Sequence, residues 1–225
     1  MAIDTLNTAL AYTCSLPATL GVVYYKRMDK SFHPFIWAMW LSVIIETVIR
    51  FVFDYSKQPV LYISTYHLYY ICNYVFFVLF FYRQKTISLP QCKKLLIAAV
   101  LIFILNSLLK SPATNLLGEK TIAFHLILFY LAVKLINQQI FSLSVSLKKN
   151  ALFFIACGLL LVAFPILQNT IRIVVRYFYQ LPTPKITVLQ RIFEIANAFS
   201  YILFFYAIIF IPKKTYIIYP NEQRR

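Results

Sequence analysis

The chain has 225 residues, 61% of them hydrophobic, and a mean hydropathy of +0.72. Soluble domains average about 45–50% apolar residues, so this composition argues against a soluble domain and indicates an integral membrane protein. The formal net charge is +15. Lys and Arg are scattered in short runs rather than gathered in one patch, which argues against a nucleic acid as the partner.

Seven stretches of the chain are apolar and long enough to be candidate membrane-spanning helices. A helix needs about 20 apolar residues to cross the ~30 Å hydrocarbon core. In chain order the stretches cover residues 5–25, 34–53, 60–82, 95–110, 121–147, 151–178 and 188–212. Because they lack the alternating pattern of membrane strands, the predicted fold is all-α: a polytopic, multi-pass protein of a cell inner membrane or an equivalent membrane.

The basic residues predict the orientation of these helices, since Lys and Arg are enriched in cytoplasmic loops. With the amino terminus outside and the carboxy terminus inside, thirteen basic residues lie on the inner side and eight on the outer side. The inner ones are Lys26, Arg27, Lys30, Arg83, Lys85, Lys93, Lys94, Lys148, Lys149, Lys213, Lys214, Arg224 and Arg225. We expect this inner basic rim to contact the membrane's anionic lipids, each residue adding about 1 kcal/mol of attraction.

Two stretches of the chain, 124 residues apart, are nearly the same helix. Six of twelve positions are identical between ICNYVFFVLFFY (residues 71–82) and IANAFSYILFFY (residues 195–206). A second pair, ETVIRFV (46–52) and QNTIRIV (168–174), recurs at an offset of 122. The alternative is that such matches arise by chance in a chain so rich in Phe, Ile, Leu and Tyr.

The near-constant offset predicts two three-helix repeats joined by a single linker helix. Residues 1–86 form the first repeat in this interpretation, and residues 87–118 form the linker helix and its loops. Residues 119–212 form the second repeat, and residues 213–225 are a basic cytoplasmic tail. The polar residues Lys134, Asn137, Gln138 and Gln139 leave open whether residues 134–147 are membrane helix or cytoplasmic loop.

This 3+1+3 arrangement with an outer amino terminus resembles the SWEET and PQ-loop transporter families. The stretch LPATLGVVYYKRMDKSFHPFIWAMWL (residues 16–41) is similar to their first repeat, in which a proline kinks helix one and a basic cluster with Lys-Ser precedes an aromatic second helix. Pro17 stands at the kink, and Ala18 replaces the family's glutamine. The resemblance implies transport of a small polar solute, with Asn73 and Asn197 lining its site.

Polar side chains within the apolar stretches are the candidate functional residues, because a charge at the bilayer centre costs roughly 2.5–3.5 kcal/mol. Residues three or four apart share a helix face, which groups Asn197 with Tyr201 and Asn73 with Tyr69 or Tyr70. We predict substrate contacts from Asn73, Asn197, Tyr70 and Tyr201. We also predict an outer gate of ion pairs from Glu46, Arg50, Gln168, Arg172 and Glu194, and helix kinks at Pro17 and Pro165. The alternative is that these residues only join the helices to one another.

No catalytic motif and no metal-ligand spacing of Cys or His stands in the sequence, so we expect neither an enzyme nor a metal or other cofactor. Two functions are consistent with these features. The first is a transporter that moves a small polar solute by alternating access between the two half-bundles. The second is a seven-helix sensor, receptor or scaffold that signals through a separate partner protein. The sequence leaves open whether the chain forms a homo-oligomer.

Overall fold

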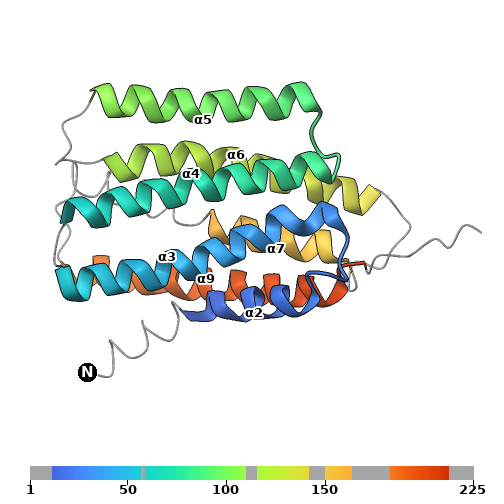
Figure 1. Ribbon diagram of the computed structural model, residues 1–225, viewed down its shortest axis with the longest axis horizontal. Coiled ribbons are helices and arrows are strands. Elements are labelled where there is room, and N and C mark those ends of the chain that lie inside the picture. The colour runs from blue at the N-terminus through green and yellow to red at the C-terminus, as the bar shows by residue number, and fades with distance from the viewer. Residues whose placement is uncertain (1–11, 57–58, 110–115, 142–149, 164–182, 213–225) are drawn as a thin grey trace, which may run out of the picture.

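The computed structural model describes residues 12–56, 59–109, 116–141, 150–163 and 183–212. All the regular elements within these ranges are helices, which confirms the all-α prediction (Figure 1). The α-helices are α2 (Ser15–Tyr24), α3 (His33–Ser56), α4 (Pro59–Arg83), α5 (Leu89–Leu109), α6 (Leu116–Phe141), α7 (Ala151–Val162) and α9 (Thr183–Phe210). Two short 3-10 helices, η1 (Tyr12–Cys14) and η2 (Lys30–Phe32), precede α2 and α3.

Two of the described stretches, Lys30–Val48 and Ala123–Phe141, are long and apolar enough to cross a membrane. Three shorter stretches are also apolar: Leu68–Arg83, Ala151–Val162 and Ile195–Phe210. Length and composition of this kind are also met by core helices of soluble proteins. The seven membrane spans therefore remain a prediction as a set.

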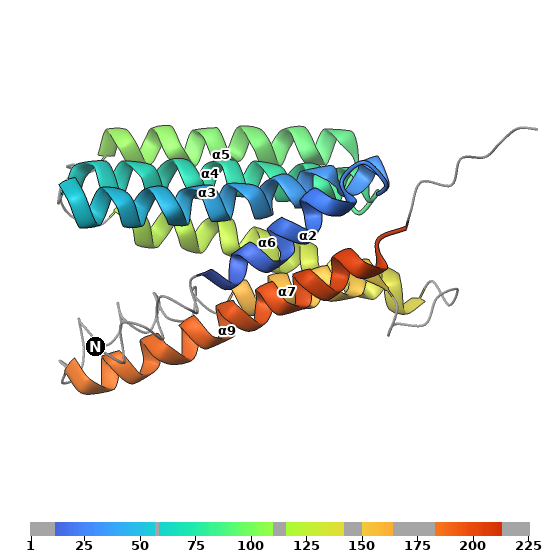
Figure 2. The ribbon, with the colours of Figure 1, turned by 60° about the horizontal axis from the view of Figure 1, so that its bottom comes forward.

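Six of the helices form a closed ring, and α5 lies outside it. Going round the ring, α2 packs on α3, α3 on α4, α4 on α6, α6 on α7, α7 on α9, and α9 returns to α2. Figure 2 shows α3, α4 and α5 on one side and α7 and α9 on the other, with α2 and α6 between them. From outside the ring, α5 contacts α4 and α6.

The ring has the same order in both of its halves. Each predicted repeat contributes three helices, of which the second packs on the first and on the third. The two halves meet through the first helix of one and the third helix of the other, at α2 with α9 and at α6 with α4. A duplicated three-helix unit would produce this arrangement, with α5 as its linker, although the duplication itself stays a prediction.

Local capping explains where two of the helices begin. Ser88 and Gln91 form a reciprocal capping box, in which each side chain accepts from the other's backbone N–H at 3.5 and 3.0 Å. The side chain of Asn150 accepts from the N–H groups of Leu152 and Phe153 and so caps α7. Asn150 also donates from Nδ2 to Oε1 of Gln139 at 2.8 Å, which ties the start of α7 to the end of α6.

Part of the polar segment 134–147, which could be helix or loop by sequence, belongs to α6. Helix α6 continues through Lys134 and Gln139 to Phe141. The exposed side chains of Asn137 and Gln138 lie on the outside of this last part. Residues 134–141 are therefore helical, whereas residues 142–149 lie outside the described residues. Pro17 lies in the first turn of α2, directly after η1, so its predicted kink stays a prediction.

Helix α7 packs closely on α9 at Gly158, which has less space for a Cβ atom than Gly21 has. A Cβ atom at Gly158 would overlap the ring of Phe204, which is 1% exposed. At Gly21, by contrast, a Cβ would lie 2.9 Å from Cγ2 of Ile36. The packing of α7 on α9 therefore depends on the absence of a side chain at Gly158.

We expect the substitution Gly158→Ala to destabilise the protein by about 1–3 kcal/mol, the usual cost of overpacking a core. Gly21→Ala is the matched control, because its overlap is smaller and alanine in a helix gains up to about 1 kcal/mol over glycine. Unfolding of the purified protein in mild detergent measures both variants. Equal stability of the two would contradict the tight approach at Gly158.

Candidate functional site

A cluster of hydroxyl and amide groups lies inside the helix ring. The hydroxyls of Ser42 in α3 and Tyr69 in α4 are 3.1 Å apart. Nδ2 of Asn73 donates to the Tyr69 hydroxyl, also at 3.1 Å. The buried side chain of Tyr201 in α9 completes the group, with its hydroxyl close to those of Tyr69 and Ser42. Since α9 is not a ring neighbour of α3 or α4, the Tyr201 side chain reaches them across the interior.

The protons of this cluster have one consistent arrangement. The Ser42 hydroxyl donates to the backbone carbonyl of Ala38 at 3.0 Å, which uses its only proton. Ser42 must then accept from Tyr69. With its own proton given to Ser42, Tyr69 can only accept from Asn73. The cluster therefore runs in one direction, from the Asn73 amide through two hydroxyls to the backbone of α3.

One polar atom of the cluster lacks a hydrogen-bond partner among the described residues. Oδ1 of Asn73 is buried and has no hydrogen-bond partner within the described part of the chain. A buried polar atom without a partner costs about 1–3 kcal/mol. Such an atom is explained most simply by a ligand or a water molecule that donates a hydrogen bond to it.

The structure brings together only part of the predicted substrate set. Asn73 and Tyr201 meet in the cluster, and half-buried Asn197 lies one turn before Tyr201 on α9. The backbone carbonyl of Asn197 accepts from the Ser200 hydroxyl at 2.6 Å. The ring of Tyr70 instead packs edge-on against His125 of α6, with centroids 6.0 Å apart.

Two members of the cluster, Ser42 and Tyr69, were not in the predicted set. The sequence did carry a signal for each of them. Ser42 shares a face of α3 with Glu46, and Tyr69 lies four residues before Asn73, as Tyr70 lies three before it. Spacing alone does not choose between Tyr69 and Tyr70, because positions three and four residues before Asn73 both lie next to it on the helix surface.

The predicted outer gate is described only at Glu46. This half-buried residue lies one turn beyond Ser42 on α3, close enough for its charge to act on the Tyr69 hydroxyl. Arg50 and Glu194 belong to α3 and α9, but their side chains lie outside the described residues. Gln168, Arg172 and the predicted kink at Pro165 lie outside them altogether. The gate of ion pairs therefore stays a prediction.

The four cysteines, Cys14, Cys72, Cys92 and Cys157, are free thiols. Cys14 is buried beside the cluster, within electrostatic reach of Tyr69 and Tyr201. Over the described ranges, no three His, Cys, Asp or Glu side chains gather closely enough to hold a metal ion. The chemistry that the cluster offers is hydrogen bonding, from hydroxyl and amide groups.

Comparison with known proteins adds no relative: no family model, curated protein or solved structure matches the chain. The class that the fold and the site define is an all-α bundle whose interior carries a buried polar cluster between its two halves.

Proposed function

We propose that the chain is a multi-pass integral membrane protein with seven spans, its amino terminus outside and its carboxy terminus inside. The support comes from side chains that are large, apolar and exposed on the outside of the bundle. They include Val22, Val23, Leu68, Ile97, Val100, Leu101, Ile104, Leu126, Phe129, Phe199 and Ile209. Soluble monomers rarely expose apolar patches larger than a few hundred Å². A lipid environment accounts for an apolar outside around a polar interior.

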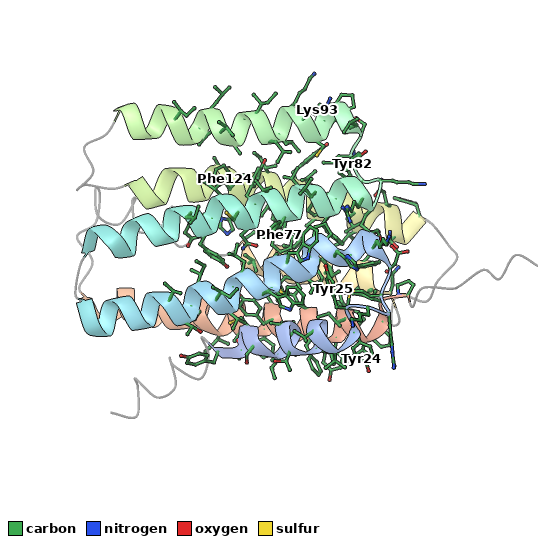
Figure 3. All side chains as sticks on the ribbon, viewed as in Figure 1. Tyr24, Tyr25, Phe77, Tyr82, Lys93 and Phe124 are labelled. Carbon is green, nitrogen blue, oxygen red and sulfur yellow. The ribbon has the colours of Figure 1, made fainter. Side chains whose placement is uncertain are left out.

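The charges at one end of the bundle support the same orientation. Figure 3 places Tyr24, at the end of α2, and Lys93, near the start of α5, at the same end. The basic residues of this end are exposed: Lys26, Arg27, Lys30, Arg83, Lys85, Lys93 and Lys94. In the proposed orientation this is the cytoplasmic end, where Lys and Arg are enriched and where anionic lipids attract them.

Within this bundle we infer a transporter of a small polar solute, similar in plan to the SWEET and PQ-loop families. The observation that carries this proposal is the polar cluster, which joins helices of both half-bundles around the unpartnered Asn73 oxygen. Transporters built from repeats bind their substrates where the halves meet. Asn73, Asn197, Tyr70 and Tyr201 would contact the solute, with the Tyr69 hydroxyl added to this set.

The outer half of the bundle would control access to this site. Glu46 lies on the outer side of the cluster in the proposed orientation, as expected for a gate residue. With it we assign Arg50, Gln168, Arg172 and Glu194 to an outer gate of ion pairs and hydrogen bonds. Rocking one half-bundle against the other would expose the cluster first to one side and then to the other.

The exposed basic end favours one other function. A rim of exposed Lys and Arg is suited to an acidic partner protein as well as to lipid. The chain would then be a membrane sensor or scaffold, which binds a ligand at the cluster and signals through that partner. A sensor needs access to its site from one side only, whereas a transporter needs it from both.

Solute flux tests the transport proposal. In vesicles containing the purified protein, we expect at least one of glycerol, a hexose and a small neutral amino acid to cross faster than in protein-free vesicles. The double variant Asn73→Leu/Asn197→Leu should slow this flux at least tenfold, about 1.4 kcal/mol. Asn137→Leu, at an exposed position on α6, is the matched control and should leave it unchanged. If none of these solutes crosses faster than through bare lipid, transport of small neutral solutes is excluded.

A further inference from the structure

A layer of phenylalanine side chains lies inside the ring of helices, beside the polar cluster. Phe35 of α3, Phe77 of α4 and Phe204 of α9 are 0%, 3% and 1% exposed. The centroid of Phe35 lies 5.3 Å from that of Phe204, edge-on, and 6.4 Å from that of Phe77. Figure 3 shows Phe77 between α4 and α3. As with the polar cluster, the contact between Phe35 and Phe204 crosses from one half-bundle to the other.

The aromatic layer lies on the side of the cluster that faces the basic end. Phe35 precedes Ser42 on α3 by two turns, roughly 10 Å. Phe77 follows Asn73 by one turn on α4, and Phe204 follows Tyr201 by about one turn on α9. Because α3 begins at the basic end and α4 and α9 end there, all three rings are displaced from the cluster in the same direction.

The ring of Phe204 is held in place from two sides. Phe35 packs on one side, and the backbone of α7 at Gly158 lies against the other, where a Cβ would overlap the ring. Phe204 also packs edge-on against Tyr201 of the polar cluster, with centroids 6.0 Å apart. A movement of Phe204 would therefore change its contact with Tyr201 in the cluster and its contact with α7 at Gly158.

The two half-bundles are also joined at the basic end itself. The N–H of Asp29, between α2 and α3, donates to the carbonyl of Pro212, which follows α9, at 3.2 Å. Within the first half, Nη1 of Arg83 donates to the carbonyl of Lys30 at 2.8 Å. The end of α9 is thereby fastened to the segment that leads into α3.

We propose that Phe35, Phe77 and Phe204 form the closed inner gate of the solute path, with the Asp29–Pro212 hydrogen bond as its fastening. This inference rests on the proposed function, because it takes the basic end as the inner side and the cluster as the binding site. A constriction lined only by apolar side chains excludes water and polar solutes. The structure is then closed toward the inside, and inward release requires Phe204 to leave its place between Phe35 and Gly158.

Thiol labelling of full-length protein in sealed vesicles tests the gate. The four native cysteines are replaced by serine, and Asn197→Cys reports on the cluster. A membrane-impermeant methanethiosulfonate is added from the inner or the outer side. We expect Phe204→Ala to speed inner-side labelling at least tenfold over the parent and to leave the outer-side rate within twofold. Phe35→Ala removes the opposing ring and should act in the same way.

A matched control separates a gate from general loosening of the bundle. Phe124 of α6 is also buried, at 2% exposed, and stacks on Tyr74 away from the aromatic layer. Phe124→Ala should leave the inner-side rate at the parental value. An outer-side rate within twofold of the parent identifies the variants that have kept their fold.

Three results would overturn the gate. They are a parental inner-side rate as fast as the outer-side rate, unchanged inner-side rates in both Phe204→Ala and Phe35→Ala, and equal acceleration by Phe124→Ala. In each of these cases the reporter is still labelled from outside, so access to the cluster from the outer side survives. A parental reporter that is labelled from neither side would instead refute the path, and the gate with it.

Discussion

Tyr74→Ala is expected to lower the free energy of unfolding by about 3–5 kcal/mol, the range for removing a buried aromatic ring. Tyr74 of α4 is 1% exposed and stacks on Phe124 of α6, with centroids 4.7 Å apart. Its hydroxyl lies 3.5 Å from the carbonyl of Leu95 in α5. One side chain thus joins α4, α5 and α6, and alanine leaves a cavity among the three helices.

The matched variant Tyr74→Phe keeps the ring and removes only the hydroxyl. A hydrogen bond of 3.5 Å is long, so its loss should cost no more than about 0.5–1 kcal/mol. Equilibrium unfolding by a denaturing detergent measures both variants. Similar losses for the two would show that the hydroxyl, rather than the packing of the ring, joins α4 to α5 and α6.

Tyr69→Phe is expected to destabilise the protein by about 2–3 kcal/mol, although it removes a single oxygen atom. That oxygen accepts a hydrogen bond from Asn73 and is hydrogen-bonded to Ser42. Its removal takes the acceptor away from the Asn73 amide and the donor away from the Ser42 oxygen, and an unsatisfied buried group costs about 1–3 kcal/mol. The same unfolding measurement applies to this variant.

Tyr130→Phe is the control for the Tyr69 hydroxyl, because Tyr130 of α6 is 64% exposed. We expect this substitution to have no measurable effect. Interhelical hydrogen bonds in membrane proteins contribute only ~0.6 kcal/mol on average. A loss of that size at Tyr69 would mean that the cluster is an ordinary set of helix contacts rather than a tightly coupled network.

The helices themselves could be predicted from the sequence because their apolar stretches are uninterrupted. The stretch predicted at 60–82 is observed as α4 (Pro59–Arg83), and the one at 34–53 as α3 (His33–Ser56). Boundaries were missed where polar residues are compatible with a helix. Helix α5 begins at Leu89 rather than at residue 95. The capping box of Ser88 and Gln91 starts the helix among polar residues, which a search for apolar stretches does not include.

The candidate site could be predicted only in outline. Asn73 and Tyr201 stood out because an amide or hydroxyl within an apolar helix needs a partner. Tyr69 and Tyr70 both lie within one turn of Asn73 on α4, and only the packing of α6 against α4 shows that Tyr70 turns toward His125. The aromatic layer was not predictable at all, because Phe35, Phe77 and Phe204 stand among many phenylalanines of equal hydropathy.

In the proposed transporter, Asn197 lines a path for solute between two half-bundles in a membrane. The most direct test of this path uses the cysteine-free protein with Asn197→Cys and no further substitution. An impermeant thiol reagent is applied to sealed vesicles from each side in turn. We predict fast labelling from outside and slow but complete labelling from inside, since a transporter opens to both. Labelling from outside only would favour the sensor. No labelling from either side would contradict the account, because Asn197 would then be a buried contact between helices.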